Sequence, residues 1–402
     1  MQPVYLDNNA TTRTDPQVVA AMLPFFTEQF GNASSTHDFG TGAGEALRRA
    51  RKQLQTLLGA AFDHEIVYTS GGTESDNAAI LSALETQTGR DEIITTAVEH
   101  PAILTLAGHI EKSRGVKVHY IGVDSCGRLD VEAYQRALGP KTAIASVMWA
   151  NNETGTIFPV EHLAKLAHGA GALFHTDAVQ AAGKIPIDLK TTEIDMLSLS
   201  GHKLHGPKGI GALYIRKGVK FRPLLRGGHQ ERGRRGGTEN APAIAGLGMA
   251  AELAAARLEE EQTRVRALRD RLERGLLQRI DHCFVTGDAP NRLPNTSNIA
   301  FEYIDGEAIL LHMNRQGIAA SSGSACTSGS TEPSHVLRAM KLPPTALLGA
   351  IRLSLSRENS EQEIDRVLEI LPGIITKLRA LSPMWRDRMA GGETAAPASH
   401  YA

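Results

Sequence analysis

The stretch from Thr142 to Ala178, "TAIASVMWANNETGTIFPVEHLAKLAHGAGALFHTDA", decides the fold class of this chain. It begins and ends with short apolar runs that are typical of buried strands. Between them, "PVEHLAKLAHGAG" (159–171) has the spacing of an amphipathic helix, and Gly171 is placed where such a helix stops. A strand, a helix and a second strand in this order predict two parallel strands joined by a helix.

The same alternation continues on both sides of this stretch. Amphipathic segments separate several further apolar runs, so we expect an α/β fold with a large, mainly parallel sheet and helices on both of its faces. The additional strands are expected at Glu65–Ser70, Glu92–Val98, Lys117–Val123, Ile194–Ser200 and Gly209–Ile215.

The pattern changes after the last of these strands. From Met249 to Ile280 the chain is rich in charges, and apolar residues such as Val265, Leu268 and Leu272 recur every three or four positions. This spacing predicts one long amphipathic helix. We expect it to lead into a second, smaller α/β unit from about Asp281 onward.

Composition excludes several classes of protein. The chain has 402 residues, a formal net charge of −1, 42% hydrophobic and 22% charged residues, so nucleic acid and anionic lipid are not expected partners. We find no apolar run long enough to span a membrane and no apolar signal segment after Met1. Cys126, Cys283 and Cys326 are odd in number and far apart, which fits neither a disulfide framework nor a CxxC zinc site. We therefore expect a cytoplasmic protein.

Two segments indicate a bound phosphate and a reactive amine. After the first strand, "GGTESDNAAI" (71–80) offers two glycines, the hydroxyl of Thr73 and the start of a helix, an arrangement that favours a phosphate. An ordinary glycine turn capped by Thr73 is the alternative. In "SLSGHKLHGPKG" (198–209), Lys203 follows the end of a strand, where open α/β sheets bind their ligands.

The carboxylate of Asp177 completes this pattern. It ends a short apolar strand, where burying a carboxylate is costly unless a cation faces it, although a helix N-cap is an alternative role. Pyridoxal phosphate requires a Schiff-base lysine, a phosphate site and an acid that faces its pyridine nitrogen. The order of phosphate loop, Asp177 and Lys203 therefore predicts a pyridoxal-phosphate site.

The stretch "SSGSACTSG" (321–329) places Cys326 among small and polar residues. A lone cysteine is commonly an inert core residue, but nothing apolar surrounds this one. Segments rich in Gly and Ser are flexible and solvated, so we expect Cys326 to be an accessible thiol on a mobile loop.

At these residues the chain resembles the fold-type I pyridoxal-phosphate enzymes and, among them, the cysteine desulfurases, with the nitrogen-fixation (NifS) type as the closest match. The resemblance implies that L-cysteine is converted to L-alanine and that its sulfur remains on the enzyme as a persulfide. It covers nearly the whole chain through "VYLDNNATT", "GNASSTH", "GGTESDN", "EHPA", "NNETGTIFPV", "DAVQAAGK", "SGHKLHGPKG", "RGGTEN", "SGSACTSGS" and "IRLSLS".

The resemblance assigns the cofactor-binding residues. It implies that Lys203 forms the Schiff base with pyridoxal phosphate, that Asp177 pairs with the pyridine nitrogen and that Gln180 bonds the phenolic oxygen. The phosphate would be held by four residues of this chain and by Thr238 of a partner chain in a homodimer. These four residues are Gly72, Thr73, Ser200 and His202.

The resemblance also assigns the catalytic and substrate-binding residues. His100 is expected over the ring, where it exchanges protons, and Asn152 and Arg352 are expected to bind the substrate carboxylate. Cys326 would accept the sulfur and could contact an iron–sulfur centre transiently through its persulfide. Taken alone, His100 could be an ordinary histidine, Arg352 a structural ion pair and Asn152 a turn residue. His175 and His205 receive no role.

The resemblance further implies a domain division and partners. We expect a large domain at 15–255, a small domain at 1–14 and 256–380 with a mobile cysteine loop at 321–330, and a flexible tail at 381–402. An iron–sulfur scaffold protein, serving nitrogenase, is the expected sulfur acceptor. Two alternatives stay open: another pyridoxal-phosphate enzyme, such as an aminotransferase or selenocysteine lyase, and a non-catalytic assembly platform.

Overall fold

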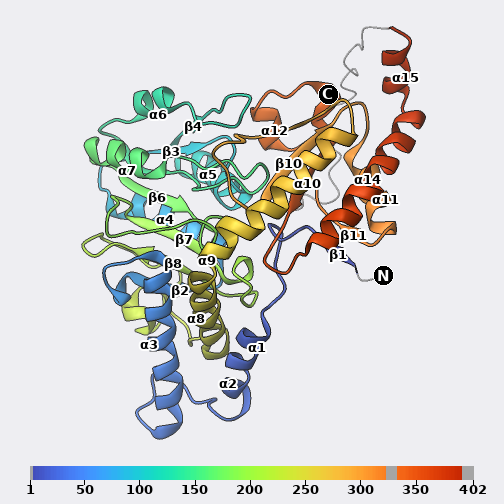
Figure 1. Ribbon diagram of the computed structural model, residues 1–402. Coiled ribbons are helices and arrows are strands. Elements are labelled where there is room, and N and C mark those ends of the chain that lie inside the picture. Colours follow the sequence, from blue (N-terminus) through green and yellow to red (C-terminus); the bar gives the residue numbers. More distant parts are fainter. Residues whose placement is uncertain (1–2, 323–332, 392–402) are drawn as a thin grey trace.

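A computed structural model describes residues 3–322 and 333–391 and contains a seven-stranded sheet at its centre (Figure 1). Every strand of this sheet except β8 runs in the same direction, and β8 is antiparallel to both of its neighbours. The expected mainly parallel sheet is therefore confirmed. In spatial order the strands are β2 (Ile66–Thr69), β8 (Gly211–Ile215), β7 (Met196–Ser200), β6 (Leu173–Asp177), β5 (Thr142–Ser146), β3 (Glu92–Thr96) and β4 (Lys117–Ile121).

Helices cover both faces of the sheet, as the sequence predicts. Side chains alternate along each strand, so Leu197 and Leu199 of β7 join the core beneath one layer of helices, whereas Met196 joins the core beneath the other. The first layer contains α3 (Asp38–Leu58), α7 (Val160–Gly169) and α8 (Ala241–Ala256), and the second contains α4 (Gly72–Thr86) and α5 (Pro101–Arg114). Gly171 has a φ of 70° just after α7, which explains why that helix stops there.

A second hydrophobic cluster surrounds a smaller antiparallel sheet of β12 (Ala350–Ser354), β10 (Thr296–Phe301) and β9 (Cys283–Val285). The N-terminal β1 (Val4–Tyr5) pairs with β11 (Ile318–Ala319), and Val4 and Leu6 belong to the same cluster. This separate core supports our proposal of a small domain at 1–14 and 256–380 beside a large one at 15–255. Its main helices are α10 (Arg266–Arg279), α11 (Gly306–Arg315) and α14 (Glu361–Leu381).

Short elements complete the described chain. They are helices or single turns of helix that connect the larger elements. They comprise α1 (Pro16–Met22), α2 (Pro24–Thr27), η1 (Asp63–Glu65), α6 (Val131–Ala137), η2 (Gly201–Lys203), η3 (Gln230–Gly233), α9 (Leu258–Glu260), η4 (Glu261–Val265), α12 (His335–Ala339), α13 (Pro344–Leu347) and α15 (Pro383–Met389).

The prediction of a single helix from Met249 to Ile280 is wrong. The structure instead has α8 followed, after a 56° bend at Arg257, by the segment Leu258–Arg279. The alanine-rich α8 packs against α3 in the large core, whereas Val265, Leu268 and Leu272 pack in the small one. The two segments pack in different hydrophobic cores, so one straight helix could not bury the apolar residues of both.

Residues 383–389 also differ from the expectation of a flexible tail from residue 381. They form α15, whose first turn is capped by the Ser382 side chain. Trp385 of this helix contacts the rings of His282 and Tyr303, and the guanidinium of Arg379 lies 4.7 Å from its ring centre. These contacts and the Ser382 cap explain why the segment is helical.

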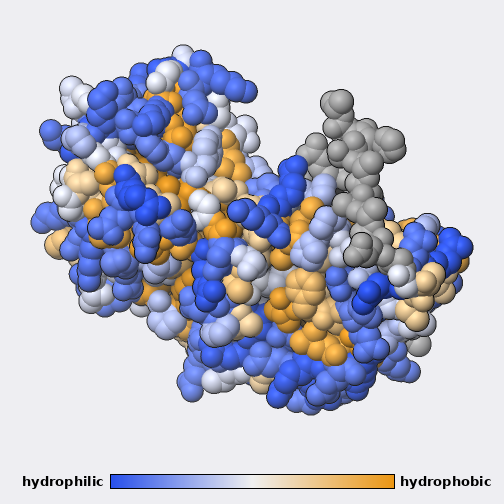
Figure 2. Space-filling view, turned by 90° about the horizontal axis from the view of Figure 1, so that it is seen from above, coloured by the Kyte–Doolittle hydropathy of each residue, from blue (hydrophilic) through white to orange (hydrophobic). Residues whose placement is uncertain are grey.

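Within residues 3–322 and 333–391, no single helix is long and apolar enough to cross a membrane; α8 and the segment after it pass that test only as a bent pair, by length and composition. Seen from above, the molecule is mainly hydrophilic at its edges, and apolar residues gather toward the middle (Figure 2).

The contact between α3 and α8 depends on a glycine, and this generates a stability prediction. A Cβ at Gly248 would lie 2.5 Å from the Cα of Ala50, so Gly248→Ala should push the helices apart and lower the free energy of unfolding by about 1–3 kcal/mol. At Gly108 in α5 no atom lies within 4 Å of such a Cβ, so Gly108→Ala should stabilise the protein by about 0.5–1 kcal/mol. Thermal unfolding of both apoproteins measures the two effects, and equal shifts would contradict the close packing.

Candidate active site

A cavity of about 350 Å³ opens at the carboxyl ends of β6 and β7, where open α/β sheets bind ligands. Among the described residues, it is lined by every predicted site residue except Thr238. Those that line it are Gly72, Thr73, His100, Asn152, Asp177, Gln180, Ser200, His202, Lys203 and Arg352. Segments far apart in the sequence therefore bring the predicted residues to one place, although their individual roles stay predictions.

Lys203 lies just beyond the end of β7, in the short helix η2. Its ammonium donates hydrogen bonds to the main-chain carbonyls of Asn9 and Ala10, the latter at 2.7 Å. The Gln180 amide donates to the same Asn9 carbonyl at 3.0 Å. The N-terminal segment thus fixes both side chains at the edge of the cavity.

Asp177 is the last residue of β6 and is buried. Its Oδ1 accepts a hydrogen bond from the Val179 amide at 2.8 Å. Burial raises the pKa of Asp177 to about 6, while the Val179 amide and the charge of Lys203 act in the opposite direction. A positively charged group placed against this carboxylate would stabilise its ionised form.

The part of the cavity beside the start of helix α4 is suited to an anion. Helix α4 begins at Gly72, and its first turn presents backbone amides and the positive end of the helix dipole. A Cβ at Gly72 would lie 2.9 Å from Cγ2 of Val179, so glycine leaves this end open. The hydroxyls of Thr73 and Ser200 lie on the same cavity.

The two predicted site histidines are neutral near pH 7. Burial, followed by the charge of Lys203, lowers the pKa of both His100 and His202 to about 4. His100 caps α5, and its Nδ1 accepts a hydrogen bond from the Ala102 amide at 3.1 Å. The neutral His100 ring therefore carries its proton on Nε2.

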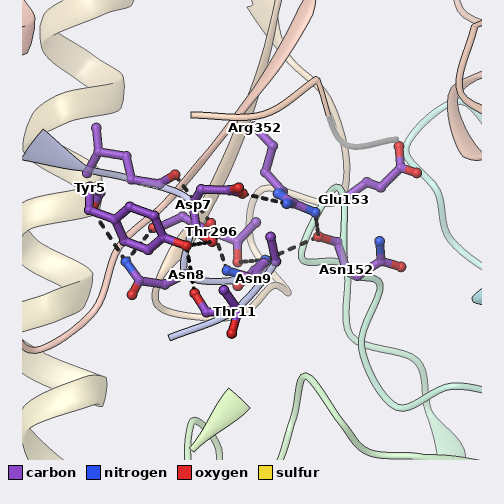
Figure 3. A network of polar contacts seen from close by, with 12 residues as sticks. Tyr5, Asp7, Asn8, Asn9, Thr11, Asn152, Glu153, Thr296 and Arg352 are labelled. Carbon is purple, nitrogen blue, oxygen red and sulfur yellow. Dashed lines mark hydrogen bonds and ion pairs between the residues drawn. The ribbon is translucent and has the colours of Figure 1, made fainter. Parts of the chain in front are cut away.

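Arg352 of β12 is buried, with 2% of its surface exposed, and is held by two oxygen atoms. Its Nη2 lies 2.7 Å from Oδ1 of Asp7, and its Nη1 donates to the carbonyl of Asn152 at 2.9 Å (Figure 3). A guanidinium has five N–H donors, so this arrangement orients the fork and uses only part of its capacity. The remaining donors suit a carboxylate.

Sequence reasoning assigned no role to the segment that organises this site. Asn9 is buried, and its side chain donates to Oγ1 of Thr296 and to the carbonyl of Asn152 (Figure 3). Asp7 binds Arg352. Both belong to "VYLDNNATT", whose run of polar residues directly after a strand was the signal available in the sequence.

Thr238 and His205 do not line this cavity. Thr238 is exposed and lies in the segment before α8. Cys326 lies outside the described residues, so its position is not part of this site description. His205 lines a small neighbouring cavity and bonds the carbonyl of Arg13 at 3.0 Å. Among residues 3–322 and 333–391 we find no cluster of His, Cys, Asp and Glu that could hold a metal ion.

The donor set fits pyridoxal phosphate. The cavity offers an amine at Lys203, a buried carboxylate at Asp177 and an anion site at the start of α4. Inside it, Oδ1 of Asp76 is buried and has no hydrogen-bond partner among the described residues, which indicates a polar site that a ligand completes. A phosphate, a cationic ring nitrogen and an aldehyde match these three features.

Comparisons with known proteins agree with this geometry. Residues 4–367 match the model of the family described as aminotransferase class-V. A protein from Gluconacetobacter diazotrophicus named cysteine desulfurase is 72% identical over 397 residues, which cover 99% of each chain. A cysteine desulfurase NifS from Azotobacter vinelandii is 63% identical over 385 residues, covering 96% of each chain. A solved structure titled NifS-like protein has a TM-score of 0.87 and 39% identity, covering 94% of this chain and 100% of its own.

The fold and the site thus define a class of pyridoxal-phosphate enzymes. The chain belongs to the aminotransferase class-V family and, within it, to the cysteine desulfurases.

Glu99, which precedes His100, is a second buried acid that the sequence analysis did not assign. Its Oε1 accepts hydrogen bonds from the Met148 amide and the Thr96 hydroxyl, both at 2.9 Å. Its Oε2 has no partner among the described residues. Burial raises the pKa of Glu99 from 4.5 to about 8, so the folded protein holds this side chain protonated at neutral pH.

This shift predicts a pH-dependent loss of stability. An acid whose pKa is raised on folding stabilises the folded state fully below its unfolded pKa, and this contribution is lost as the pH rises toward 8. Glu99→Gln should remove a loss on the order of 1.4 kcal/mol per pH unit within that window. Thermal unfolding of the apoproteins between pH 5 and pH 9 measures it. The exposed Glu111→Gln variant is the control, and its stability should fall with pH as steeply as that of the wild type. An equally steep fall for Glu99→Gln would contradict the prediction.

Proposed function

We propose that this protein converts L-cysteine to L-alanine and transfers the sulfur to Cys326. The C–S bond of the substrate breaks, and an S–S bond forms at the Cys326 sulfur. Of the two thiol protons of substrate and enzyme, one ends on the methyl carbon of alanine and the other on the outer sulfur of the persulfide. No external oxidant is needed. The observation that carries the proposal is the convergence of Lys203, Asp177 and Arg352 on one cavity in a chain of this family.

We further propose that pyridoxal phosphate is the cofactor. Gly72, Thr73, Ser200 and His202 would hold its phosphate, Asp177 and Gln180 would bind its ring, and Lys203 would bind its aldehyde. When bound, the cofactor supplies an electron-withdrawing ring that makes the α-proton of an amino acid acidic.

The residues of the chain then bind the substrate and move protons. Arg352, oriented by Asp7 and Asn152, would bind the substrate carboxylate through its remaining N–H donors. Lys203 would take up the α-proton once its amine is released. His100, neutral with its proton on Nε2, is suited to give a proton before it accepts one.

Cys326 would attack the substrate sulfur as a thiolate. A thiol with an ordinary pKa of about 8.5 is only about 3% ionised at pH 7, so the site must favour its charged form. Ser321, at the start of this segment, pairs with the main chain of Arg352, which connects the segment to the substrate-binding residue. Cys283 is unsuited to this role because burial raises its pKa to about 11.

An iron–sulfur scaffold protein is the proposed acceptor of the sulfur, in a cytoplasmic pathway that serves nitrogenase. The name NifS of a 63% identical relative supports this use. Cys326 would contact the growing cluster only while it delivers sulfur. The cluster would belong to the acceptor protein. Among the described residues of this chain we find no cluster of His, Cys, Asp and Glu that could hold a metal ion.

We also propose that the active protein is a homodimer formed through α1, α2 and the start of α3. This surface exposes Leu23, Phe26, Phe30 and Phe39, each with 58–64% of its surface accessible. Clustered exposed apolar side chains mark interaction sites. Helix α2 packs against the first half of α8, shortly after Thr238. A second copy docked here would cover the apolar surface and bring Thr238 near the partner's cavity.

The activity is tested with purified protein, L-cysteine and a thiol reductant, measuring alanine and sulfide together. Wild type should produce both in equal amounts. Cys326→Ala should retain the yellow colour of the bound cofactor and still bind L-cysteine, but it should lose more than about 99% of alanine formation, because no positioned thiolate remains. Without reductant, mass spectrometry should find one extra sulfur on Cys326 of the wild type.

The other two cysteines are the matched controls. Cys126→Ala and Cys283→Ala should keep wild-type turnover. A persulfide on either of them, or normal turnover by Cys326→Ala, would contradict the proposal. The alternative of a selenocysteine lyase would be favoured if only L-selenocysteine supported alanine formation and Cys326→Ala remained active on it.

The homodimer is tested by changing its apolar surface. Phe26→Glu combined with Phe30→Glu should shift sedimentation to the monomer, because burying two charges without partners is costly. Leu381→Glu, at an equally exposed leucine of α14, should remain dimeric. Unchanged sedimentation of the double variant would exclude this surface as the interface.

A further inference from the structure

Polar side chains form a buried row across three strands beneath helix α4. Ser146 lies opposite His175 in the pairing of β5 and β6, and Asp177 lies opposite Ser198 in the pairing of β6 and β7. His175 and Asp177 are two positions apart on β6, so both point to the same face of the sheet. All four residues are buried, and α4 covers this face.

Hydrogen bonds connect this row to Asp76, which α4 contributes one turn after Gly72 and Thr73. The Ser146 hydroxyl lies 2.8 Å from Nδ1 of His175, and Nε2 of His175 lies 2.9 Å from the Ser198 hydroxyl. The hydroxyl of Ser198 also acts on the carboxyl group of Asp76 and lowers its pKa, against the larger effect of burial. The chain of contacts runs from the core to an acid on the wall of the cavity.

The direction of these hydrogen bonds follows from the neutral imidazole. Burial lowers the pKa of His175 to about 3, so the ring has one N–H and one acceptor nitrogen at neutral pH. One consistent order is that Ser146 donates to Nδ1 and Nε2–H donates to Ser198. The hydroxyl proton of Ser198 is then available to the carboxyl group of Asp76. His175 therefore offers Asp76 no positive charge, although its Nε2 lies 3.7 Å from Oδ1 of Asp76.

Asp76 has acids, and no cation, as its other charged neighbours in the described structure. It is 1% exposed, and Oδ1 has no hydrogen-bond partner among the described residues. The charges that act on it come from Asp177 and Glu99, and both raise its pKa. Two neighbouring buried carboxylates do not both ionise readily. Asp177 has the amide of Val179 and the charge of Lys203 to stabilise its ionised form, whereas Asp76 has neither.

We propose that Asp76 is a positioning residue that remains a protonated carboxylic acid beside Asp177, with its proton on Oδ1. The row of Ser146, His175 and Ser198 offers the hydroxyl proton of Ser198 to the other oxygen of Asp76, which would accept it. Asp177 then carries the single negative charge that faces the cofactor ring. The inference rests on the proposed cofactor, but the protonation of Asp76 is a property of the chain itself.

Infrared difference spectroscopy tests this protonation directly. The spectrum of wild-type holoenzyme minus Asp76→Asn, at pH 7, should contain the carbonyl band of a protonated carboxylic acid. Asn keeps a carbonyl acceptor for Ser198 and is neutral, so this variant should bind pyridoxal phosphate within about threefold of the wild type and keep its absorption maximum. Asp76→Leu removes the acceptor and leaves a buried hydroxyl unsatisfied, so its affinity should fall about tenfold or more.

Thr176→Val is the matched control, because Thr176 lies between His175 and Asp177 on β6 and points to the opposite face. Its hydroxyl is also buried without a partner among the described residues, yet the substitution should leave the carboxyl band, the absorption maximum and the affinity unchanged. Labelling wild-type aspartates with ¹³C at the carboxyl carbon provides a test that needs no variant. A shifted protonated-aspartate band is expected.

Two results would overturn the proposal. In the first, the wild type minus Asp76→Asn spectrum contains the bands of an ionised carboxylate and lacks the band of a protonated acid. In the second, the labelled wild type contains no band of a protonated aspartate. An Asp76→Asn variant as weak as Asp76→Leu would show that a charge is needed. Failure of the wild type to form alanine would overturn the proposed function, yet it would not change the infrared result.

Discussion

The main-chain carbonyl of Asn9 is the acceptor on which the arrangement of the cavity depends. It receives hydrogen bonds from the Lys203 ammonium and the Gln180 amide, which come from separate loops of the large domain. The side chain of the same residue bonds Thr296 of the small sheet and the carbonyl of Asn152. Asn9 thus holds the Lys203 amine, the Gln180 amide and the small sheet in a fixed relation. Loss of any of these buried contacts would leave a polar group unsatisfied, at a cost of about 1–3 kcal/mol.

Strand alternation supplies the second constraint. In "IDMLSLS" the leucines pack in the large core, so Ser198 and Ser200 necessarily face α4. In the neighbouring strand, His175 and Asp177 face the same way. A sheet face with this many polar groups is costly to bury unless they bond one another. The side chains of α4 and the hydrogen-bonded row beneath it satisfy that requirement, and the row ends at the cavity.

The strands of the large sheet could be predicted from the sequence because parallel strands buried on both faces are short apolar runs. Lys203 and Asp177 could be found because each directly follows or ends such a run. The bend at Arg257 could not, since both helical segments have the same spacing and differ only in the core against which they pack. Asp7 binds Arg352 across 345 positions, and Asp76 on a helix has the local pattern of a solvated residue. Their importance arises from long-range contacts that no local pattern contains.

Arg352 connects the proposed carboxylate-binding site to the segment that leads to Cys326. Its guanidinium is held by Asp7 and Asn152, while its main-chain amide and carbonyl pair with Ser321. β12 is the edge strand of the small antiparallel sheet, so the main chain of Arg352 lies between Asn298 of β10 and Ser321. The four residues that follow Ser322, up to Cys326, span at most about 13 Å when fully extended. A substrate bound at Arg352 would therefore lie at a defined place relative to the base of a short tether. Under the proposed function, a tether of this length favours transfer of sulfur within the protein over release of sulfide to water.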